Sequence, residues 1–307
     1  MFKNITIFTL PQDWQPSLEA MEAAVQQNRF TPCGPTVKKS CGFSEPRMID
    51  NGPLVELVAG QRILRFVIEV KKVPGAAIKK KAEEAAAQIE QETGRTPGRK
   101  EMKSLKEDAV QALLPHAFPK QQAVMVWFNF EHGWMITDAS TSARNDDLLT
   151  ALVRAFAGLT LAPLNTQQTP QSLMTHLLTA PSHEEWPEGF CVERSVVLRS
   201  YDADKSSVKF DRHHLQNDEI RNHISEGKLP AQLSMSWEGR IGFSLTDSGV
   251  LKKVSFLDGV LDETSQGENE DRFDADVALS TAELSRFVPA LIDVLGGPLI
   301  KAPEARG

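Results

Sequence analysis

The chain has 307 residues, of which 41% are hydrophobic, and its formal net charge at pH 7 is -7. This length accommodates about two domains with buried cores, and the negative charge argues against a histone-like protein that holds nucleic acid by bulk charge. Three cysteines, Cys33, Cys41 and Cys191, are too few for a disulfide framework and match no zinc-site spacing. We therefore expect a reducing, cytoplasmic compartment.

The first quarter of the sequence predicts short strands and one helix. Its opening residues carry one lysine and a short alternating apolar run before Pro11, which does not fit a signal peptide. A proline- and glycine-rich stretch at residues 31–53 is expected to be irregular. The expected elements are a strand at 2–9, a helix at 18–27, and a hairpin of strands at 54–58 and 63–70.

At residues 75–114 the pattern changes to apolar residues at helical spacing among strong helix formers. Gly94 is expected to end a first helix, and Thr96 and Pro97 are expected to begin a second. The apolar seam of both helices is thin and rich in alanine. This predicts an antiparallel helical hairpin that projects from the body and forms no part of its core.

Strands and helices then alternate, with a polar, proline-containing boundary at residues 161–170. The expected strands are 123–130, 133–138, 190–199, 231–237, 240–246 and 251–257, and the expected helices are 145–159, 171–179, 217–226 and 281–295. The predicted class is α+β, with antiparallel sheets and packed helices in two halves. The predicted regions are 1–74 with 115–162, the projecting hairpin at 75–114, and 163–307.

Charge is unevenly distributed along the chain. Residues 71–120 hold 11 Lys/Arg against 7 Asp/Glu, whereas residues 258–276 are strongly acidic. Such asymmetry indicates a surface for a polyanion on an otherwise acidic body. A solvated helical surface beside an acidic loop would give the same pattern, and charge alone does not separate the two interpretations.

The cations of the predicted hairpin are candidate phosphate contacts: Lys79, Lys80, Lys81, Arg95, Arg99, Lys100, Lys103 and Lys106. Lys79, Lys80 and Lys103 each have a glutamate four residues later and are expected to pair with it. Arg95, Arg99 and Lys100 have no such partner. Unpaired cations on a protruding arm can neutralise phosphates without reading base sequence.

Phe118 and Lys120 follow the hairpin directly, after the break at Pro115. A phenylalanine beside a lysine can stack on a base or wedge between bases. The alternative is a phenylalanine that fills a core where two regions meet, and the sequence does not decide between these roles.

Sequence signatures of enzymes are absent: the chain contains no glycine-rich phosphate loop and no GxSxG, HExxH or CxxC motif. The adjacent His213 and His214 would point to opposite faces of a strand and make poor joint metal ligands. Aspartates could suggest a Mg²⁺ site at Asp202, Asp204 and Asp211, or at Asp271, Asp274 and Asp276. Loops rich in aspartate are usually solvated turns, so we expect no catalytic activity, no metal and no cofactor.

Four stretches together resemble the RdgC family of recombination-associated DNA-binding proteins: FTPCG at 30–34, GRTPGRKEMKSLKEDAVQALLPHAF at 94–118, NDEIRNHISEGK at 217–228 and RFDADVALSTAELSRFVPALIDVLGG at 272–297. The resemblance covers essentially the whole chain. It implies a homodimer closed into a ring whose positively lined hole admits duplex DNA. It also implies sequence-independent binding to single- and double-stranded DNA, association with the nucleoid, and antagonism of RecA by denying it access to DNA.

The resemblance also implies roles for particular residues. It places the helical hairpin on a finger-like projection of the family and Phe118 near the gateway into the hole. It places Lys209, Arg212 and His213 in a second region of DNA contact. Two alternatives to a DNA clamp remain, namely a module that docks its basic hairpin on an acidic protein and a Mg²⁺-dependent DNA-processing enzyme.

Overall fold

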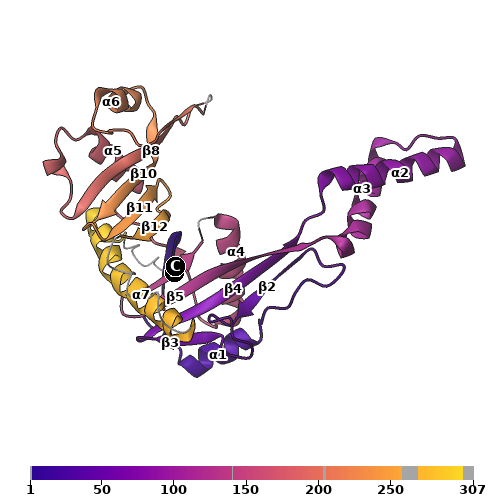
Figure 1. The fold of residues 1–307 in the computed structure, drawn as a ribbon, viewed down its shortest axis with the longest axis horizontal. Helices are drawn as coiled ribbons and strands as arrows, with labels where there is room; N and C mark the ends of the chain where they lie inside the picture. The colour runs from indigo at the N-terminus through magenta and orange to yellow at the C-terminus, as the bar shows by residue number, and fades with distance from the viewer. Residues whose placement is uncertain (1, 140, 203–204, 258–268, 300–307) are drawn as a thin grey trace, which may run out of the picture.

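The structure is a computed structural model that describes residues 2–139, 141–202, 205–257 and 269–299. It shows a curved body and an arm that extends away from it (Figure 1). Helices pack against antiparallel strands, which confirms the α+β class.

The strands of both halves belong to one antiparallel sheet, which corrects the expectation of separate sheets. They are β1 (Ile5–Thr9), β2 (Lys39–Ser44), β3 (Val55–Val58), β4 (Gln61–Lys71), β5 (Pro119–Asn129), β6 (Trp134–Asp138), β7 (Ala162–Pro163), β8 (Phe190–Arg199), β9 (Ser207–Phe210), β10 (Leu229–Trp237), β11 (Ile241–Thr246) and β12 (Leu251–Phe256). Their order is β2-β4-β5-β6-β1-β12-β11-β10-β8-β9, with β3 beside β4 and β7 beside β1.

Strand β1 joins the two halves of this sheet. It pairs along its whole length with β6, from Ile5 opposite Asp138 to Thr9 opposite Trp134. On the side of the second half, Ile5 also pairs with Leu251 of β12. Local sequence patterns predict strands but not partners so distant in the chain, which is why separate sheets were expected.

Seven helices are described: α1 (Leu18–Gln26), α2 (Gly75–Thr93), α3 (Arg99–Leu113), α4 (Ser142–Ala155), α5 (Pro170–Thr179), α6 (Asp218–Ser225) and α7 (Asn269–Val294). In the first half, α1 and α4 contribute to the buried cluster that contains Phe66 and Phe128. Residues on the opposite face of the sheet form a second buried hydrophobic cluster together with residues of α5, α6 and α7. None of the described helices is both long and apolar enough to cross a bilayer.

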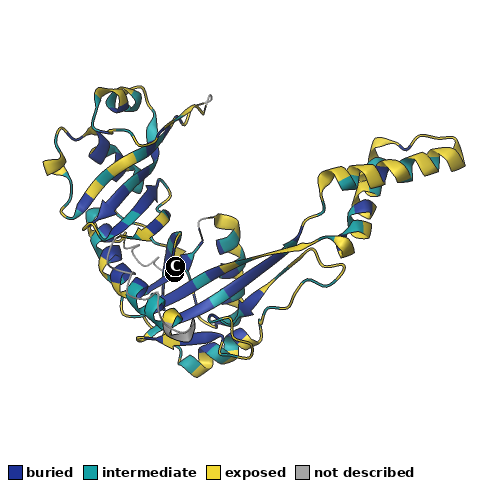
Figure 2. Cartoon of the chain, in the orientation of Figure 1, coloured by how far each residue is buried: buried dark blue, intermediate teal, exposed yellow. Residues whose placement is uncertain are grey.

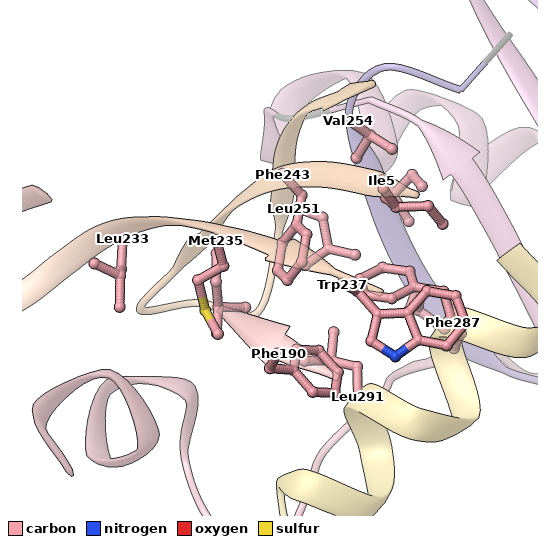
Figure 3. Packing of buried hydrophobic residues seen from close by; sticks show 14 of the residues in the cluster. Ile5, Phe190, Leu233, Met235, Trp237, Phe243, Leu251, Val254, Phe287 and Leu291 are labelled. Atoms are coloured by element: carbon pink, nitrogen blue, oxygen red, sulfur yellow. The ribbon is translucent and has the colours of Figure 1, made fainter. Parts of the chain in front are cut away.

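Helix α7 packs against both halves of the sheet, and its buried Phe287 side chain lies among aromatic residues of the second half. The Phe287 ring lies 4.8 Å from that of Phe243 and 5.6 Å from that of Trp237, measured between centroids. Figure 3 shows Phe287 and Leu291 of α7 beside these strand residues and Ile5. The same cluster includes Trp127 of the first half, so one helix buries apolar residues from both halves.

Several elements differ from the sequence prediction, among them β2, β9 and α7. Strand β2 lies within the stretch expected to be irregular, where a side chain at Gly42 would collide with the backbone of Asn28 and Phe30. Strand β9 was not predicted, because four residues are too few to show alternation. Helix α7 begins at Asn269 rather than 281, since Val277 is fully buried one turn and more before the predicted start.

Candidate nucleic-acid interface

Helices α2 and α3 stand at the end of the arm, beyond the long strands β4 and β5 (Figure 1). They pack against each other, yet Ala82 is the buried residue of α2 and Ala109 that of α3. Most of their surface is exposed (Figure 2). Gly94 ends α2 in the left-handed conformation, with φ 68°, as predicted, whereas α3 begins after Gly98 rather than after Thr96.

All eight candidate cations of this helix pair are exposed: Lys79, Lys80, Lys81, Arg95, Arg99, Lys100, Lys103 and Lys106. The expected pairs of Lys79 with Glu83 and Lys103 with Glu107 are present, at 3.7 and 3.9 Å. Lys80 forms no ion pair with a described residue. The lysine charges are therefore only partly offset.

Arg95 corrects one sequence expectation, because it does have a partner. Its guanidinium contacts the Glu101 carboxylate across the connection between the two helices. Arg99 and Lys100 have no ion-pair partner in the part of the chain that the structure describes. These two residues at the start of α3, like Lys80, therefore present charges to an outside anion that no described carboxylate offsets.

Phe118 is 92% exposed, which excludes the alternative of a core residue within this chain. The 3-10 turn Leu114–His116 precedes it, and Leu114 is almost fully buried. Lys120 is also exposed and lies opposite Val70 on β4. The buried Leu114 on one side and the paired strand on the other fix the backbone that carries the exposed ring.

A buried polar cluster holds the strand ends next to Phe118. The Glu69 carboxylate accepts hydrogen bonds from the Cys33 backbone N–H at 2.6 Å and from Gln121 Nε2 at 2.7 Å. Both hydrogen bonds lower the pKa of Glu69, and the bond from Gln121 has the larger effect. Lys71 Nζ donates to the Gly34 carbonyl at 2.9 Å. Together these contacts attach the loop around residues 33–34 to the β4–β5 pair.

The burial that stabilises this cluster makes its thiol less reactive. Burial, followed by the neighbouring Glu69, raises the pKa of Cys33. A raised pKa lowers the thiolate fraction at neutral pH, and the thiolate is the nucleophile. The geometry thus supports a structural role for Cys33.

The second predicted region lies at β9 and the loop after it. Lys209 is exposed and contacts Asp211 at 3.9 Å, and Arg212 is exposed with φ 53°, in the left-handed region. His213 is half-buried, with its ring 5.3 Å from that of Phe210 and its Nε2 3.8 Å from Glu219. Lys209 and Arg212 are therefore accessible to a ligand, whereas His213 also serves packing.

The two sets of candidate residues are not brought together within one chain. The α2–α3 pair lies at one end of the molecule, and β9, next to β8 and close to α6, lies at the other (Figure 1). A single ligand that touched both sets would have to span the molecule or contact two copies of the chain.

Of the aspartates considered for Mg²⁺, Asp204 lies outside the described residues. Asp274 pairs with Arg47, at 2.6 Å. Among the residues that the structure describes, no group of three or more His, Cys, Asp or Glu side chains has the arrangement of a metal site.

Sequence reasoning missed three cations of the second half: Arg199, Lys252 and Lys253. They lie on β8 and β12, and Lys253 acts electrostatically on Asp211. The signal that could have found Arg199 and Lys252 is the alternation of polar and apolar residues along the predicted strands 190–199 and 251–257, which marks one face of those strands as solvated.

Comparison with known proteins gives a consistent result. The family model RdgC, described as "Putative exonuclease, RdgC", matches residues 1–298. A protein of Janthinobacterium sp. (strain Marseille) named "Recombination-associated protein RdgC" is 37% identical over 303 residues, which cover 98% of this chain and 99% of the relative.

Two further relatives carry the same name. The protein of Cupriavidus pinatubonensis is 35% identical over 96% of this chain and 98% of its own length. That of Dechloromonas aromatica is 31% identical over 98% of this chain and 99% of its own length. Matches of this identity and extent leave one conclusion: this chain belongs to the RdgC family.

Proposed function

We propose that this chain is a non-enzymatic DNA-binding protein of recombination that binds duplex and single-stranded DNA without reading their sequence. Two copies would close into a ring around the duplex, in the cytoplasm and on the nucleoid. The observation that carries the proposal is the 92% exposure of Phe118 beside exposed cations. The names of the relatives, which associate those proteins with recombination, support the same reading.

The chemistry of the arm suits such binding. Lysine and arginine side chains contact phosphates, which carry no base identity, so affinity should hardly depend on sequence. An exposed aromatic ring can stack on any unpaired base. The combination accounts for binding to both duplex and single strands by one surface.

A ring would reconcile local basic surfaces with the overall charge of -7. Its outside could be acidic while its hole carried the cations, and the two distant sets of candidate residues could both face the DNA. On a closed circle, dissociation would require the ring to open, so individual phosphate contacts need not be strong. A ring that occupies duplex DNA would also limit access by RecA.

The test is a gel shift with linear and covalently closed circular duplex over a salt series. We expect binding to both, a steep loss of affinity with salt, and a complex on closed circles that outlasts the complex on linear DNA of the same sequence. Equal dissociation rates on the two forms would contradict encirclement. No binding at moderate salt would favour the alternative of a module that docks on an acidic protein.

Limitation of RecA is tested separately, by adding the protein before or after RecA to a strand-exchange reaction. If the protein acts by occupying DNA, inhibition should be stronger when it is added first. It should also fade when excess competitor duplex is supplied. Inhibition that ignores both order and competitor would contradict this mechanism.

A second function is favoured by one observation, the family description "Putative exonuclease, RdgC". Incubation of end-labelled linear duplex with the protein and Mg²⁺, with a chelator as control, distinguishes the two. Metal-dependent shortening of the linear DNA that follows the protein through purification would establish an exonuclease and overturn the non-enzymatic proposal.

A further inference from the structure

One face of the sheet in the second half is covered by none of the described helices. Leu233, Met235 and Trp237 on β10 belong to the buried cluster shared with α5, α6 and α7. Because side chains alternate along a strand, the residues between them, Gln232, Ser234 and Ser236, point to the opposite face. We call this opposite side of β8–β12 the open face.

The open face is lined by short polar side chains. The register places Lys209, Val197, Gln232 and Thr246 in one row across four strands. In the next row Ser234 lies opposite Ser244, with their hydroxyl oxygens 3.0 Å apart, and Ser244 lies opposite Lys252. Ser244 and Thr246 are almost fully buried, so the side chains that an outside ligand would meet on this face are the longer ones around them, Gln232, Lys252 and Arg199 among them.

A hollow of about 260 Å³ lies on this face, and its lining residues include Arg199 from β8 and Lys252 from β12. Thr246, Ser248 and Gln232 contribute polar groups between them. Neither cation forms an ion pair within the described part of the chain. Two cations beside a polar hollow form an arrangement suited to an anion with several oxygen atoms.

The carboxylates of the open face already have hydrogen-bond donors within the chain. Asp247, which also lines the hollow, accepts a hydrogen bond from the Tyr201 hydroxyl at 2.7 Å. Glu193 accepts one from Ser236 and Asp211 one from Ser195. The hydroxyl of Ser195, then the charges of Lys209, Arg212 and Lys253, lower the pKa of Asp211. Cations from both β12 and the end of β9 therefore act on one carboxylate, and all three carboxylates are engaged within the chain, whereas Arg199 and Lys252 form no ion pair with a described residue.

We infer that the open face is a contact surface for the phosphate backbone of nucleic acid, with Arg199 and Lys252 as phosphate ligands at the hollow. The inference rests on the proposed function and assigns to it residues that the sequence did not reveal. Charge complementarity selects the occupant, because a polyanion matches cations that stand on three strands of this face, β8, β9 and β12. Hydroxyl and amide groups between the cations can hydrogen-bond phosphate oxygens without reading bases.

The experiment compares full-length R199Q/K252Q with the wild type and with R221Q/R286Q. The control pair removes the same charge from the helix-covered side of the same half, where Arg221 lies on α6 and Arg286 on α7. A third variant, R199K/K252R, keeps the charge. Affinity for a labelled duplex is measured from about 50 to 200 mM salt, with melting temperatures for all variants.

We expect R199Q/K252Q to bind the duplex about tenfold more weakly at low salt. The slope of log affinity against log salt should be shallower by about 1.8, or about 0.9 for each lost phosphate contact. R199K/K252R should stay within about twofold of the wild type. The control should keep the wild-type slope.

Each outcome bears on one claim. If the wild type binds DNA and R199Q/K252Q has the same slope as the control, the open face is not the contact surface, whereas the proposed function stands. If the wild type does not bind, the proposed function fails first. If R199Q/K252Q has a lower melting temperature than the wild type, the charge-preserving variant R199K/K252R tests the role of charge. If R199K/K252R is folded but its slope of log affinity against log salt is as shallow as expected for R199Q/K252Q, a role for charge is contradicted.

Discussion

The Arg95 guanidinium lies 3.0 Å from the Glu101 carboxylate, so that an ion pair spans the connection between α2 and α3. The pair is well exposed, and exposed pairs contribute only about 0–1 kcal/mol to stability. The pair matters more for ligand binding than for stability, because the Glu101 carboxylate offsets the positive charge that Arg95 would otherwise present to a phosphate. Arg99 and Lys100 keep their charges available.

Replacing Arg95, Arg99 and Lys100 together by alanine should weaken DNA binding by similar factors for unrelated sequences. The double variant R99A/K100A should retain most of this loss, since Arg95 is already paired. Gel shifts on two duplexes of unrelated sequence measure both effects. The free energy of unfolding should change by less than about 0.5 kcal/mol, because all three side chains are exposed. A loss confined to one duplex would contradict phosphate contact.

Phe118→Ser should weaken binding by about tenfold, which corresponds to about 1.4 kcal/mol, while leaving the melting temperature nearly unchanged. The reason is its exposure of 92%, which leaves little packing to lose. Phe128→Ser, in the strand β5 that follows Phe118, is the matched control, because Phe128 is 1% exposed. That substitution should cost about 3–5 kcal/mol of stability. A melting temperature lowered equally by both substitutions would return Phe118 to a structural role.

Light scattering should give the mass of a dimer at micromolar concentration, twice the 34.0 kDa of one chain. A dimer is expected because one curved chain leaves the two sets of candidate residues far apart (Figure 1). The measurement is repeated at high salt, where a dimer held by apolar contacts should persist. A monomer mass at low and high salt would remove the ring from the proposal.

Glu69→Gln should destabilise the protein by about 1–3 kcal/mol. The amide can no longer accept both hydrogen bonds, from Cys33 N–H and Gln121 Nε2, in this buried site. Chemical denaturation at pH 7 measures the loss. Glu84→Gln on the exposed surface of α2 serves as control and should have almost no effect.

The difference in stability between the wild type and E69Q should also depend on pH. Because the folded protein lowers the pKa of Glu69, its contribution to stability is complete above the unfolded pKa of about 4.3. It is lost as the pH falls through the lower pKa of the folded state. The stability difference between wild type and E69Q should thus be constant from pH 7 to about 5 and shrink below about 4. A difference that grows on acidification would contradict the assignment.

The sequence predicts those features that depend on neighbours along the chain. Helical spacing and Gly94 mark the end of α2, and the exposed cations follow from its polar composition. It could not show that Arg95 meets Glu101, because the path of residues 94–98 decides which side chains approach. Nor could it place Arg199 near Lys252, since strand order and register bring together residues more than fifty positions apart.

The pairing of Ile5 with both Asp138 and Leu251 has a consequence for synthesis on the ribosome. Strand β1 can pair with β6 once residue 138 has emerged, and β7 can pair with Phe8 and Thr9 on the other edge once residue 163 has emerged, but the Ile5 end of that edge must wait for residue 251. At about 5–20 residues per second, the 113 residues between them take about 6–23 s. During this interval the Ile5 end of that edge is unpaired at the centre of the future sheet. Nascent chains stalled between these two points should be the form most prone to aggregate and most dependent on chaperones.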